Sequence, residues 1–578
     1  MLAELNALMP KDIRFSRSDY PLSKTNMNPK LIEFAKKYPD LYSRNIHKIR
    51  ELGEEVGYKS GHNVGLDDMF LKNQSQIDKK LNGIEKQISH STKENSKKIL
   101  IRSFNDIQKM TVANSGNNIV TQAQSKGRGN PATAARSIGS VVFAVDMNSE
   151  PYPFLIKNSL AKGLNAHEQY ASGGQARFAA VQTAVSTSQP GAMGKILIAN
   201  AEGLKISEKD CGTRNGVEER IDDGSLIGRY EAGTNSLITN RLLSDRKKRG
   251  KKRILVRSAT TCRSKKGVCS MCYGKTTSGG TANIGHNAGI EAAQTVSEKA
   301  TQLILSAKHN VQGRSKSTIP TGFEAQKILL NPTDKYKGKS TLSSTEGKVD
   351  SIEKLPIGGY SISVAGEKHH VGHDVFPLVK PGDMITKGQK ISSGLTSTRD
   401  VVQHKGILEA RNYLATELHK ANGGKIDKRN FEIIARGYLN LSKNKNDVSN
   451  ESMFDFDSHV QTLTPPYTQT LKVNNPQVTN KFLVDAFETN SPGARVTSAM
   501  VKKAKSHGVN EFKVSHSPMA YTPVFKTYEQ KPQHSGSLWQ KINFRGINKA
   551  IKNDLLFGER TDLNRLGSDR AKYSVGTL

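Results

Sequence analysis

The chain has 578 residues and carries 86 lysines and arginines against 53 aspartates and glutamates, giving a formal net charge of +33. This excess favours a polyanionic partner, above all nucleic acid, although a merely soluble basic surface or an acidic partner subunit would also accommodate it. No run of about 18 apolar residues is present, so the sequence predicts no membrane span. Aromatic residues make up only 6%, with one tryptophan, Trp539, which favours contact with phosphates over base stacking.

The length predicts about three or four domains, and the patterns below predict a mixed α+β multidomain chain. Apolar residues recur at helical spacing in two neighbouring stretches: Ile77, Leu81, Ile84 and Ile88, then Leu100, Phe104 and Ile107. We expect two antiparallel helices there, joined by a polar tip at residues 90–95. Lys, Asn and Ser are enriched in residues 442–452, which is typical of a linker.

A glycine-rich basic segment at residues 125–139 contains Arg128 and Arg136. It suits a loop that approaches phosphates with its backbone and guanidinium groups, and an ordinary flexible loop fits equally well. Residues 163–201 are rich in Ala, Gln and Ser, and are interrupted by Gly173, Gly174 and Pro190. A long helix without an apolar face is exposed, bridges between domains, or moves.

The four cysteines of the chain are Cys211, Cys262, Cys269 and Cys272. One distant cysteine followed by C-x6-C-x2-C predicts a structural zinc site with four thiolate ligands, because tetrahedral zinc favours a close pair on a tight turn. Unpaired core cysteines or disulfides are the alternative. Residues 1–11 show no secretory signal pattern, so nothing there indicates an oxidising compartment.

The segment after the cysteines carries a resemblance to a known family. "GVCSMCYGK" (residues 267–275) followed by "GIEAAQTVSEKATQLILSAKH" (residues 289–309) resembles the zinc site and trigger loop of the beta-prime subunit of multisubunit DNA-dependent RNA polymerase. "GHNVGLDDM" resembles the start of the family's rim helices, and "SKGRGNP" the loop before its bridge helix. Residues 163–197 are similar to the bridge helix, and "VKPGDMITKGQ" and "DKRNFEIIARGYLN" to later beta-prime segments.

The resemblance covers roughly residues 60–565 and implies a domain order. The segments are an N-terminal docking segment (1–60), a rim-helix hairpin (61–120), a loop before the bridge helix (121–160), the bridge helix (161–203), a zinc-binding region (204–284), the trigger loop (285–332), a β-rich module with following helices (333–440) and a C-terminal clamp or assembly region (441–578).

The resemblance also implies roles for individual residues. In the family, the trigger helix folds against the bridge helix when the correct nucleoside triphosphate enters. Gln302 would then face the ribose, Leu305 would pack on the incoming base, and His309 would lie beside the triphosphate as a proton donor or a positioning charge. Arg128 would lie near the triphosphate, and Thr187 and Ser188 would pack against the new base pair. Arg136 is displaced by one position from its counterpart.

Several residues depart from the family pattern. Ser306 replaces the usual trigger-helix arginine, Lys308 replaces an aromatic residue, and Pro190 and Ala192 replace a bridge-helix serine and tyrosine. We hypothesise that Lys308 neutralises the negative charge of the triphosphate in place of the missing arginine.

The Asp-x-Asp-x-Asp loop that holds the catalytic magnesium in this family is not present. Asp455 and Asp457 come after the trigger loop and lack a third aspartate, so we interpret them as a solvated turn. The resemblance therefore implies the C-terminal half of a split beta-prime subunit. Its partners would be an N-terminal beta-prime fragment that holds Mg²⁺, beta-like subunits that are themselves whole or split, an initiation factor, template DNA, RNA and nucleoside triphosphates.

The four-cysteine site and the position of the division indicate a bacterial-type enzyme, and the short trigger loop resembles split subunits of giant bacteriophages. We expect a viral protein in the cytoplasm of a bacterial host. Two alternatives stay open: a non-catalytic, zinc-containing scaffold that binds nucleic acid, and an independent metalloenzyme. Four thiolates would leave no open metal position for the latter.

Overall fold

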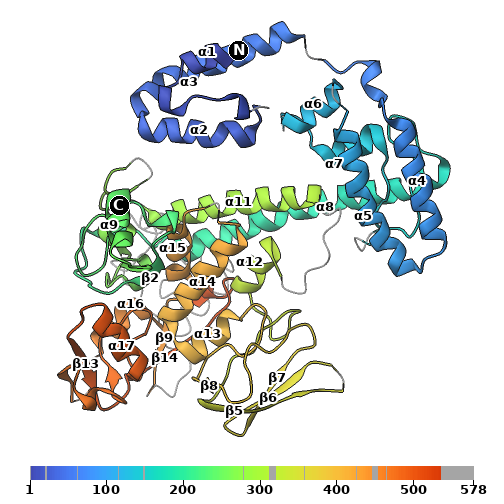
Figure 1. Cartoon of the computed structure of the whole chain (residues 1–578). Helices are drawn as coiled ribbons and strands as arrows, with labels where there is room; N and C mark the ends of the chain where they lie inside the picture. Colours follow the sequence, from blue (N-terminus) through green and yellow to red (C-terminus); the bar gives the residue numbers. More distant parts are fainter. Residues whose placement is uncertain are drawn as a thin grey trace, which may run out of the picture. The chain divides into compact units, whose positions relative to one another are not determined.

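The computed structural model describes residues 2–19, 22–61, 63–114, 116–125, 127–146, 150–276, 279–310, 320–356, 358–424, 426–445, 453–463, 465 and 467–534. The chain divides into a first compact unit, Met1–Ala184 with Lys308–Arg314, and a second unit, Val185–Ala307 with Ser315–Leu578. Helices dominate the first unit, and the second mixes helices with small sheets (Figure 1). The expectation of a mixed α+β multidomain chain is confirmed. Among the described residues, no helix is long and apolar enough to cross a membrane.

The first unit contains several helices before the long helix that leaves it. They are α1 (Leu2–Ala7), α2 (Lys24–Lys37), α3 (Pro39–Ser60), α4 (Gln74–Ser89), α5 (Lys93–Val112), α6 (Asn118–Ser125) and α7 (Pro131–Ala134). A small core near the N-terminus is centred on the fully buried Phe34, whose ring meets Tyr42 edge-on.

Helices α4 and α5 form a hairpin. The Asn73 side chain, just before α4, donates to the Met110 carbonyl near the end of α5 at 2.9 Å, so the helices run antiparallel. Their facing sides bury Ile77, Leu81 and Leu100 completely or almost completely. The predicted pair of antiparallel helices is confirmed, because the apolar spacing gives each helix one face to bury.

The segment predicted as a basic loop is mostly helical. Residues 131–139 form α7 and a π-helical turn, Ala135–Gly139. The Asn130 side chain caps α7 by accepting from the Thr133 amide at 2.9 Å, and Pro131 takes the first helical position, where its missing N–H costs nothing. The loop prediction is wrong beyond Asn130.

Arg136 points into this helical unit. Its guanidinium carbon lies 4.9 Å from the centre of the Phe104 ring and 5.5 Å from that of Phe143. Burial lowers the pKa of Arg136 to about 10. The side chain therefore packs on aromatic rings as a cation–π contact. Arg128, in contrast, is exposed.

Helix α8 (Ala166–Ala201) has 36 residues, continues through Pro190, and passes from the first unit into the second. Its first turn is anchored by Glu168, a buried carboxylate that accepts from the Lys157 amide and from the Asn158 side chain, both at 2.8 Å. The middle of the helix is largely exposed, and burial resumes at Pro190 and Met193. The predicted long helix is confirmed.

The second unit is built around one large core. Its helices are α9 (Asn240–Lys248), α10 (Ser270–Tyr273), α11 (Ala288–Asn310), α12 (Gly322–Leu330), α13 (Thr398–Lys405), α14 (Ile407–Ala421), α15 (Lys428–Tyr438), α16 (Phe456–His459) and α17 (Ser498–Ser506). The end of α8 and the helices α11, α12, α14 and α15 bury their apolar sides together, with the cysteine region beside them. The stretch that resembles the family's trigger helix, residues 289–309, lies within the helix α11.

Short strands complete the second unit. They are β1 (Ile206–Glu208), β2 (Val217–Arg220), β3 (Arg253–Val256), β4 (Val268–Cys269), β5 (Gly347–Lys354), β6 (Tyr360–Val364), β7 (Glu367–Val371), β8 (Met384–Ile385), β9 (Leu441–Asn444), β10 (Met453–Asp455), β11 (Gln469–Lys472), β12 (Phe482–Leu483), β13 (Glu511–Ser515) and β14 (Tyr521–Pro523). Strands β5 to β8 form an antiparallel sheet in the order β7-β6-β5-β8, over a core that includes Val349 and Ile362.

Two further sheets lie near the C-terminus, in the orders β10-β9-β14 and β11-β13-β12. Strand β9 pairs with β14, which places Ser442 opposite Pro523 and Asn444 opposite Tyr521. The linker expected at residues 442–452 is therefore wrong at its start, where the chain forms the central strand of a sheet. Residues 446–452 lie outside the described part of the chain.

Candidate metal centre and its helices

Two paired strands bring the four cysteines together. Strand β1 runs parallel to β4, with Ile206 opposite Val268 and Glu208 opposite Cys269. Cys211 follows β1, and Cys272 lies on the short helix α10 that follows β4. Gly267 makes this pairing possible: its φ is +98°, and a Cβ there would lie 2.1 Å from the Lys205 carbonyl oxygen. A larger residue at position 267 would disrupt the approach of the two strands.

The four sulfurs have the geometry of a metal site. All ligand atoms lie within 4.8 Å of one another. The Sγ–Sγ distance is 3.8 Å between Cys211 and Cys272 and 3.7 Å between Cys211 and Cys262. Tetrahedral zinc with bonds of about 2.3 Å separates its sulfurs by about 3.8 Å, so the residues present fit a zinc ion. All four cysteines are free thiols rather than disulfides, and three of them are buried.

Backbone amides support the sulfurs. The Cys269 amide points at the Cys262 sulfur at 3.4 Å, and the Cys272 amide at the Cys269 sulfur at 3.3 Å. Hydrogen bonds from the other three cysteines lower the pKa of Cys211, which favours its thiolate form. Burial raises the pKa of Cys262, and hydrogen bonds from the other cysteines raise that of Cys272. A bound metal ion would therefore have to displace protons from these two thiols, because the thiolate is the ligand.

A buried arginine faces the cluster. Nη2 of Arg257 lies 3.5 Å from the sulfurs of Cys211, Cys269 and Cys272, and it donates to the Asp210 carboxylate at 2.6 Å. Burial alone would lower the pKa of Arg257, but the charge of Cys272 and the hydrogen bond to Asp210 outweigh it and raise that pKa. Four thiolates around a divalent ion carry an excess of two negative charges, and Arg257 offsets part of it.

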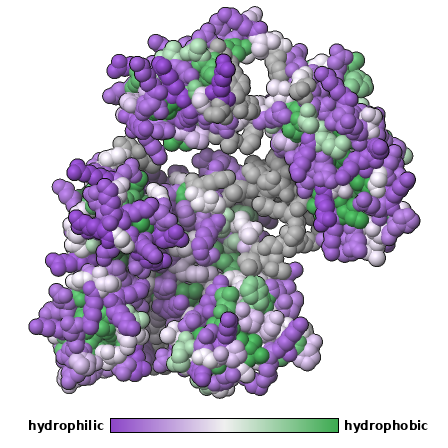
Figure 2. Space-filling model, viewed as in Figure 1, coloured by the Kyte–Doolittle hydropathy of each residue, from purple (hydrophilic) through white to green (hydrophobic). Residues whose placement is uncertain are grey.

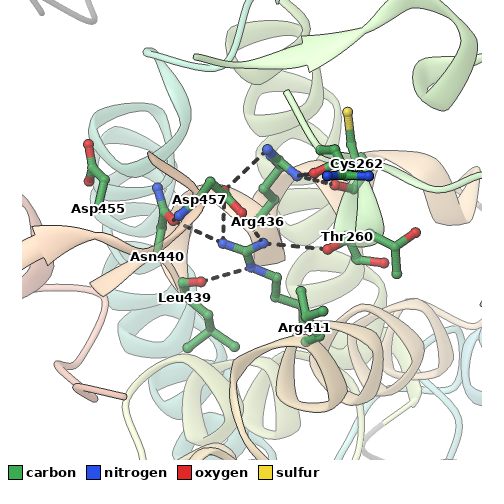
Figure 3. A network of polar contacts seen from close by, with 12 residues as sticks. Thr260, Cys262, Arg411, Arg436, Leu439, Asn440, Asp455 and Asp457 are labelled. Carbon is green, nitrogen blue, oxygen red and sulfur yellow. Dashed lines mark hydrogen bonds and ion pairs between the residues drawn. The ribbon is translucent and has the colours of Figure 1, made fainter. Parts of the chain in front are cut away.

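A second ionic network fixes the other side of the cysteine region (Figure 3). Arg436 donates to the carbonyl oxygens of Ala259 and Cys262, both at 2.8 Å. The Asp457 carboxylate lies 3.2 Å from the Arg436 guanidinium. Arg411 donates to both oxygens of the same carboxylate, at 2.9 and 3.0 Å. Both arginines are fully buried. These contacts connect Cys262 to α14, α15 and α16, which carry Arg411, Arg436 and Asp457.

Asp457 corrects the expectation of a solvated turn at Asp455 and Asp457. Asp455 is exposed, but Asp457 is buried between two arginines. Its ion pairs also argue against a role in holding magnesium, because both carboxylate oxygens are already occupied.

Helices α8 and α11 pack closely beside the cysteine region. A Cβ on Gly194 would lie 2.7 Å from Oγ of Ser297, and one on Gly289 would lie 1.7 Å from the Ala201 carbonyl oxygen. The Asn287 side chain donates to the Glu202 carbonyl at 3.0 Å. Small residues line both helices here, so the two backbones come close together.

The residues expected to contact the nucleotide are only partly described. Gln302 is exposed on α11, and its amide oxygen accepts from Nζ of Lys299 at 2.8 Å. Ser188 is exposed on α8, and Arg128 is exposed in the first unit. The side chains of Thr187, Leu305, Ser306, Lys308 and His309 lie outside the described residues. The structure thus brings the four cysteines together, while the nucleotide-contacting set stays a prediction.

Sequence reasoning missed the roles of Arg257, Arg411 and Arg436, and it misinterpreted Asp457, the partner of the last two. Arg257 had a readable signal, because it directly follows the three apolar residues that end β3, shortly before the cysteines. Arg436 likewise interrupts an amphipathic helix. Each arginine pairs with an acid that is distant in the sequence, so no local pattern identifies the partner.

The chain resembles known RNA polymerase subunits. Residues 163–355 match the family model described as RNA polymerase Rpb1, domain 5. The chain is 26% identical over 443 residues to the DNA-directed RNA polymerase subunit beta' of Acholeplasma laidlawii, covering 69% of this chain and 32% of that protein. It is 27% identical to that of Acetivibrio thermocellus over 443 residues, covering 69% and 38%.

The beta' subunit of Lactiplantibacillus plantarum gives a comparable match, 27% identical over 440 residues, covering 68% of this chain and 36% of that protein. The chain thus matches about a third of the length of these relatives. The matched segment includes α8, the four cysteines, α11 and α12. These findings support a relationship between this chain and the C-terminal part of bacterial-type RNA polymerase beta-prime subunits.

Proposed function

We propose that the chain is a subunit of a multisubunit DNA-dependent RNA polymerase and corresponds to the C-terminal half of a split beta-prime subunit. The packing of α8 against α11 beside the four-cysteine site is the observation that carries the proposal. The similarity to beta' proteins runs through these same elements. In this interpretation α8 is the bridge helix, α11 and α12 flank the trigger loop, and α4 and α5 are the rim helices.

The proposed contacts with the substrate follow from this assignment. Gln302 faces the ribose, Leu305 the base and His309 the triphosphate. Thr187 and Ser188 pack against the new base pair, and Arg128 lies near the triphosphate. The cysteines hold a structural zinc ion.

In this proposal, the chain contributes to catalysis by positioning the substrate. The trigger loop aligns the incoming nucleotide with the RNA 3′ end and excludes water when it closes, and a correct substrate completes the site. Magnesium ions, which stabilise the charge that develops on the phosphates, are supplied from a partner chain that holds the aspartate loop. The chain alone is inactive.

The proposed assembly contains the N-terminal beta-prime fragment, beta-like subunits, an initiation factor, DNA and RNA. The departures at Ser306 and Lys308 and the short trigger loop favour an enzyme of a giant bacteriophage that works in the cytoplasm of its bacterial host.

Purification of the tagged chain from its source cells tests the proposal. We expect beta-like chains and a chain with a triple-aspartate loop to copurify and to extend RNA on an RNA–DNA scaffold with magnesium. A complex that binds nucleic acid without extending RNA would instead favour the non-catalytic scaffold.

A further inference from the structure

The segment between β2 and the cysteines has an unusual density of positive charge. Eight of the thirteen residues from 241 to 253 are lysine or arginine and one, Asp245, is acidic. In the whole chain, 86 of 578 residues are basic. The high net charge of the protein therefore does not by itself account for this concentration.

The charged segment is an ordered part of the fold. Oγ1 of Thr239 caps α9 by accepting from the Leu242 amide at 3.3 Å, and Leu242 and Leu243 pack on a small core with Ile254 and Val256. After α9, Gly250 turns the chain with a φ of +73°, and the Lys251 amide donates to the Arg246 carbonyl at 3.2 Å. Because the leucines face the core, the cations of this helix and turn face solvent.

Only two of the eight cations are used in ion pairs among the described residues. Arg246 pairs with Glu231 at 2.7 Å, and Arg253 pairs with Glu218 at 3.1 Å. Asp222 lies near Lys247 but is already bonded to the Arg220 guanidinium at 2.8 Å. The other six cations are exposed, and we call them the basic surface: Arg241, Lys247, Lys248, Arg249, Lys251 and Lys252.

A structural explanation covers only part of this surface. Cations in the last turn of a helix stabilise its dipole, and Arg246, Lys247 and Lys248 occupy the last turn of α9. That effect falls off within one turn, so it does not explain Arg249, Lys251 or Lys252. Figure 2 shows hydrophilic residues at the place that α9 occupies in Figure 1.

A hollow lies beside the basic surface, with both cations and acids in its walls. Lys251 and Lys252 line one side of a hollow of about 1070 Å³, and Ser506 and His507, at the end of α17, line the other. The acids in its wall include Glu218 and Glu231, which are the partners of Arg253 and Arg246. Helix α17 adds exposed Lys502 and Lys505.

We propose that the basic surface binds the phosphate backbone of duplex DNA, away from the site of nucleotide addition. Six cations on an ordered helix and turn suit a ladder of closely spaced phosphates, whose neutralisation releases counterions. No aromatic residue occurs between positions 239 and 253, so the surface lacks the stacking platform that single strands use. The inference rests on the proposed function only for where the DNA comes from. The attraction between these cations and phosphates does not depend on that function.

The salt dependence of DNA binding tests the proposal. The purified full-length chain, in the complex with which it copurifies, is titrated with a mixed-sequence DNA duplex over a range of salt concentrations. The variant carries Lys248→Gln, Arg249→Gln, Lys251→Gln and Lys252→Gln. The control carries Lys354→Gln, Lys368→Gln, Lys380→Gln and Lys387→Gln, four exposed lysines of the β5–β8 module, and changes the charge by the same amount.

We expect the basic-surface variant to lower the slope of log K against log salt by about 0.9 for each phosphate that the protein no longer neutralises, and the control to leave it unchanged. At fixed salt, affinity should fall on the order of tenfold or more. Equal slopes and affinities in the two variants would overturn the proposal. A larger loss of affinity for single-stranded RNA than for the duplex would overturn the assignment to duplex DNA.

The same preparations separate this inference from the proposed function. Unchanged metal content and circular dichroism establish that both variants are folded. If the wild-type complex does not extend RNA, the polymerase proposal fails, but the difference between the two salt slopes still decides whether the basic surface binds DNA.

Discussion

The cysteine region and the α8–α11 helix pair lie side by side in the second unit and are stabilised in opposite ways. Around the cysteines, buried cations lie against anionic partners: Arg257 contacts sulfurs and Asp210, and Arg436 and Arg411 share Asp457. Between the helices, contact depends on small residues such as Gly194 and Gly289. The first arrangement fixes its geometry with paired charges. The second brings two helix backbones close together and adds hydrogen bonds where the helices meet the following chain, such as that from the Asn287 side chain to the Glu202 carbonyl. Under the proposed function, the fixed cysteine region would hold in place the helices beside which the trigger loop closes and reopens.

The largest expected effect is at the cysteine cluster. Replacing Cys272 with serine removes one of four buried ligands, so we expect loss of the bound metal and destabilisation of the second unit on the order of several kcal/mol. Metal analysis and thermal unfolding measure both effects. Full metal retention by the Cys272→Ser variant would contradict the assignment of a four-thiolate site.

The ionic network gives the next effect. Asp457→Ala leaves Arg411 and Arg436 buried without their shared carboxylate, which should cost about 3–5 kcal/mol in the free energy of unfolding. The exposed acid Glu353 on β5 provides the control, and Glu353→Ala should change stability by no more than about 0.5 kcal/mol. Denaturant unfolding compares the two. Similar values for both variants would show that the network does not stabilise the region.

The close approach of the helix pair is tested at a glycine. In Gly289→Ala the new methyl group would overlap the Ala201 carbonyl, so α11 must move away from α8 at a cost of about 1–3 kcal/mol. Gly191→Ala, on the same α8 helix, meets no atom within 4 Å and should be neutral or stabilising by up to about 1 kcal/mol. Thermal unfolding distinguishes them, and equal melting temperatures would remove the packing argument.

Arg257 is expected to affect metal retention more than folding. Arg257→Gln removes the cation beside three sulfurs, and loss of such an outer partner typically weakens metal binding by about 10–100-fold. The rate of metal transfer to a chromogenic chelator measures the change, and Arg257→Lys should restore part of it. If the metal is transferred to the chelator as slowly from Arg257→Gln as from the wild type, the arginine does not strengthen metal binding.

The smallest effect concerns the anchor of α8. Burial raises the pKa of Glu168, but hydrogen bonds from the Asn165 amide, the Asn158 side chain and backbone amides outweigh it and lower that pKa. A lowered pKa means that the carboxylate stabilises the fold above its unfolded pKa of about 4.3 and loses this contribution as pH falls below that value. Glu168→Gln should therefore cost about 1–2 kcal/mol near pH 7, and less in acid. A cost that does not change between these conditions would contradict the role of the charge.

Much of the helical structure could be predicted from local pattern. The spacing from Ile77 to Ile107 identified α4 and α5, and the stretches now seen as α8 and α11 were also expected to be helical. The cysteine spacing predicted the cluster, because metal ligands must converge wherever the chain runs between them.

The errors have physical reasons. Asn130 and Pro131 are a helix-start signal, but the glycines before them suggested a loop. Residues 442–444 look like a linker in isolation and become a strand through pairing with residues 521–523. Asp457 looks like a surface acid until the fold brings Arg411 and Arg436 around it. The last two errors concern contacts between distant parts of the sequence, which no local pattern contains.

The rate of single-nucleotide addition by the purified complex tests the central claim most directly. The wild-type complex should extend RNA on a scaffold with magnesium, and His309→Ala should slow that step, while His373→Ala, at an exposed position on the β5–β8 module, should not. An assembled complex that adds no nucleotide, or that adds it equally fast without His309, would contradict the account.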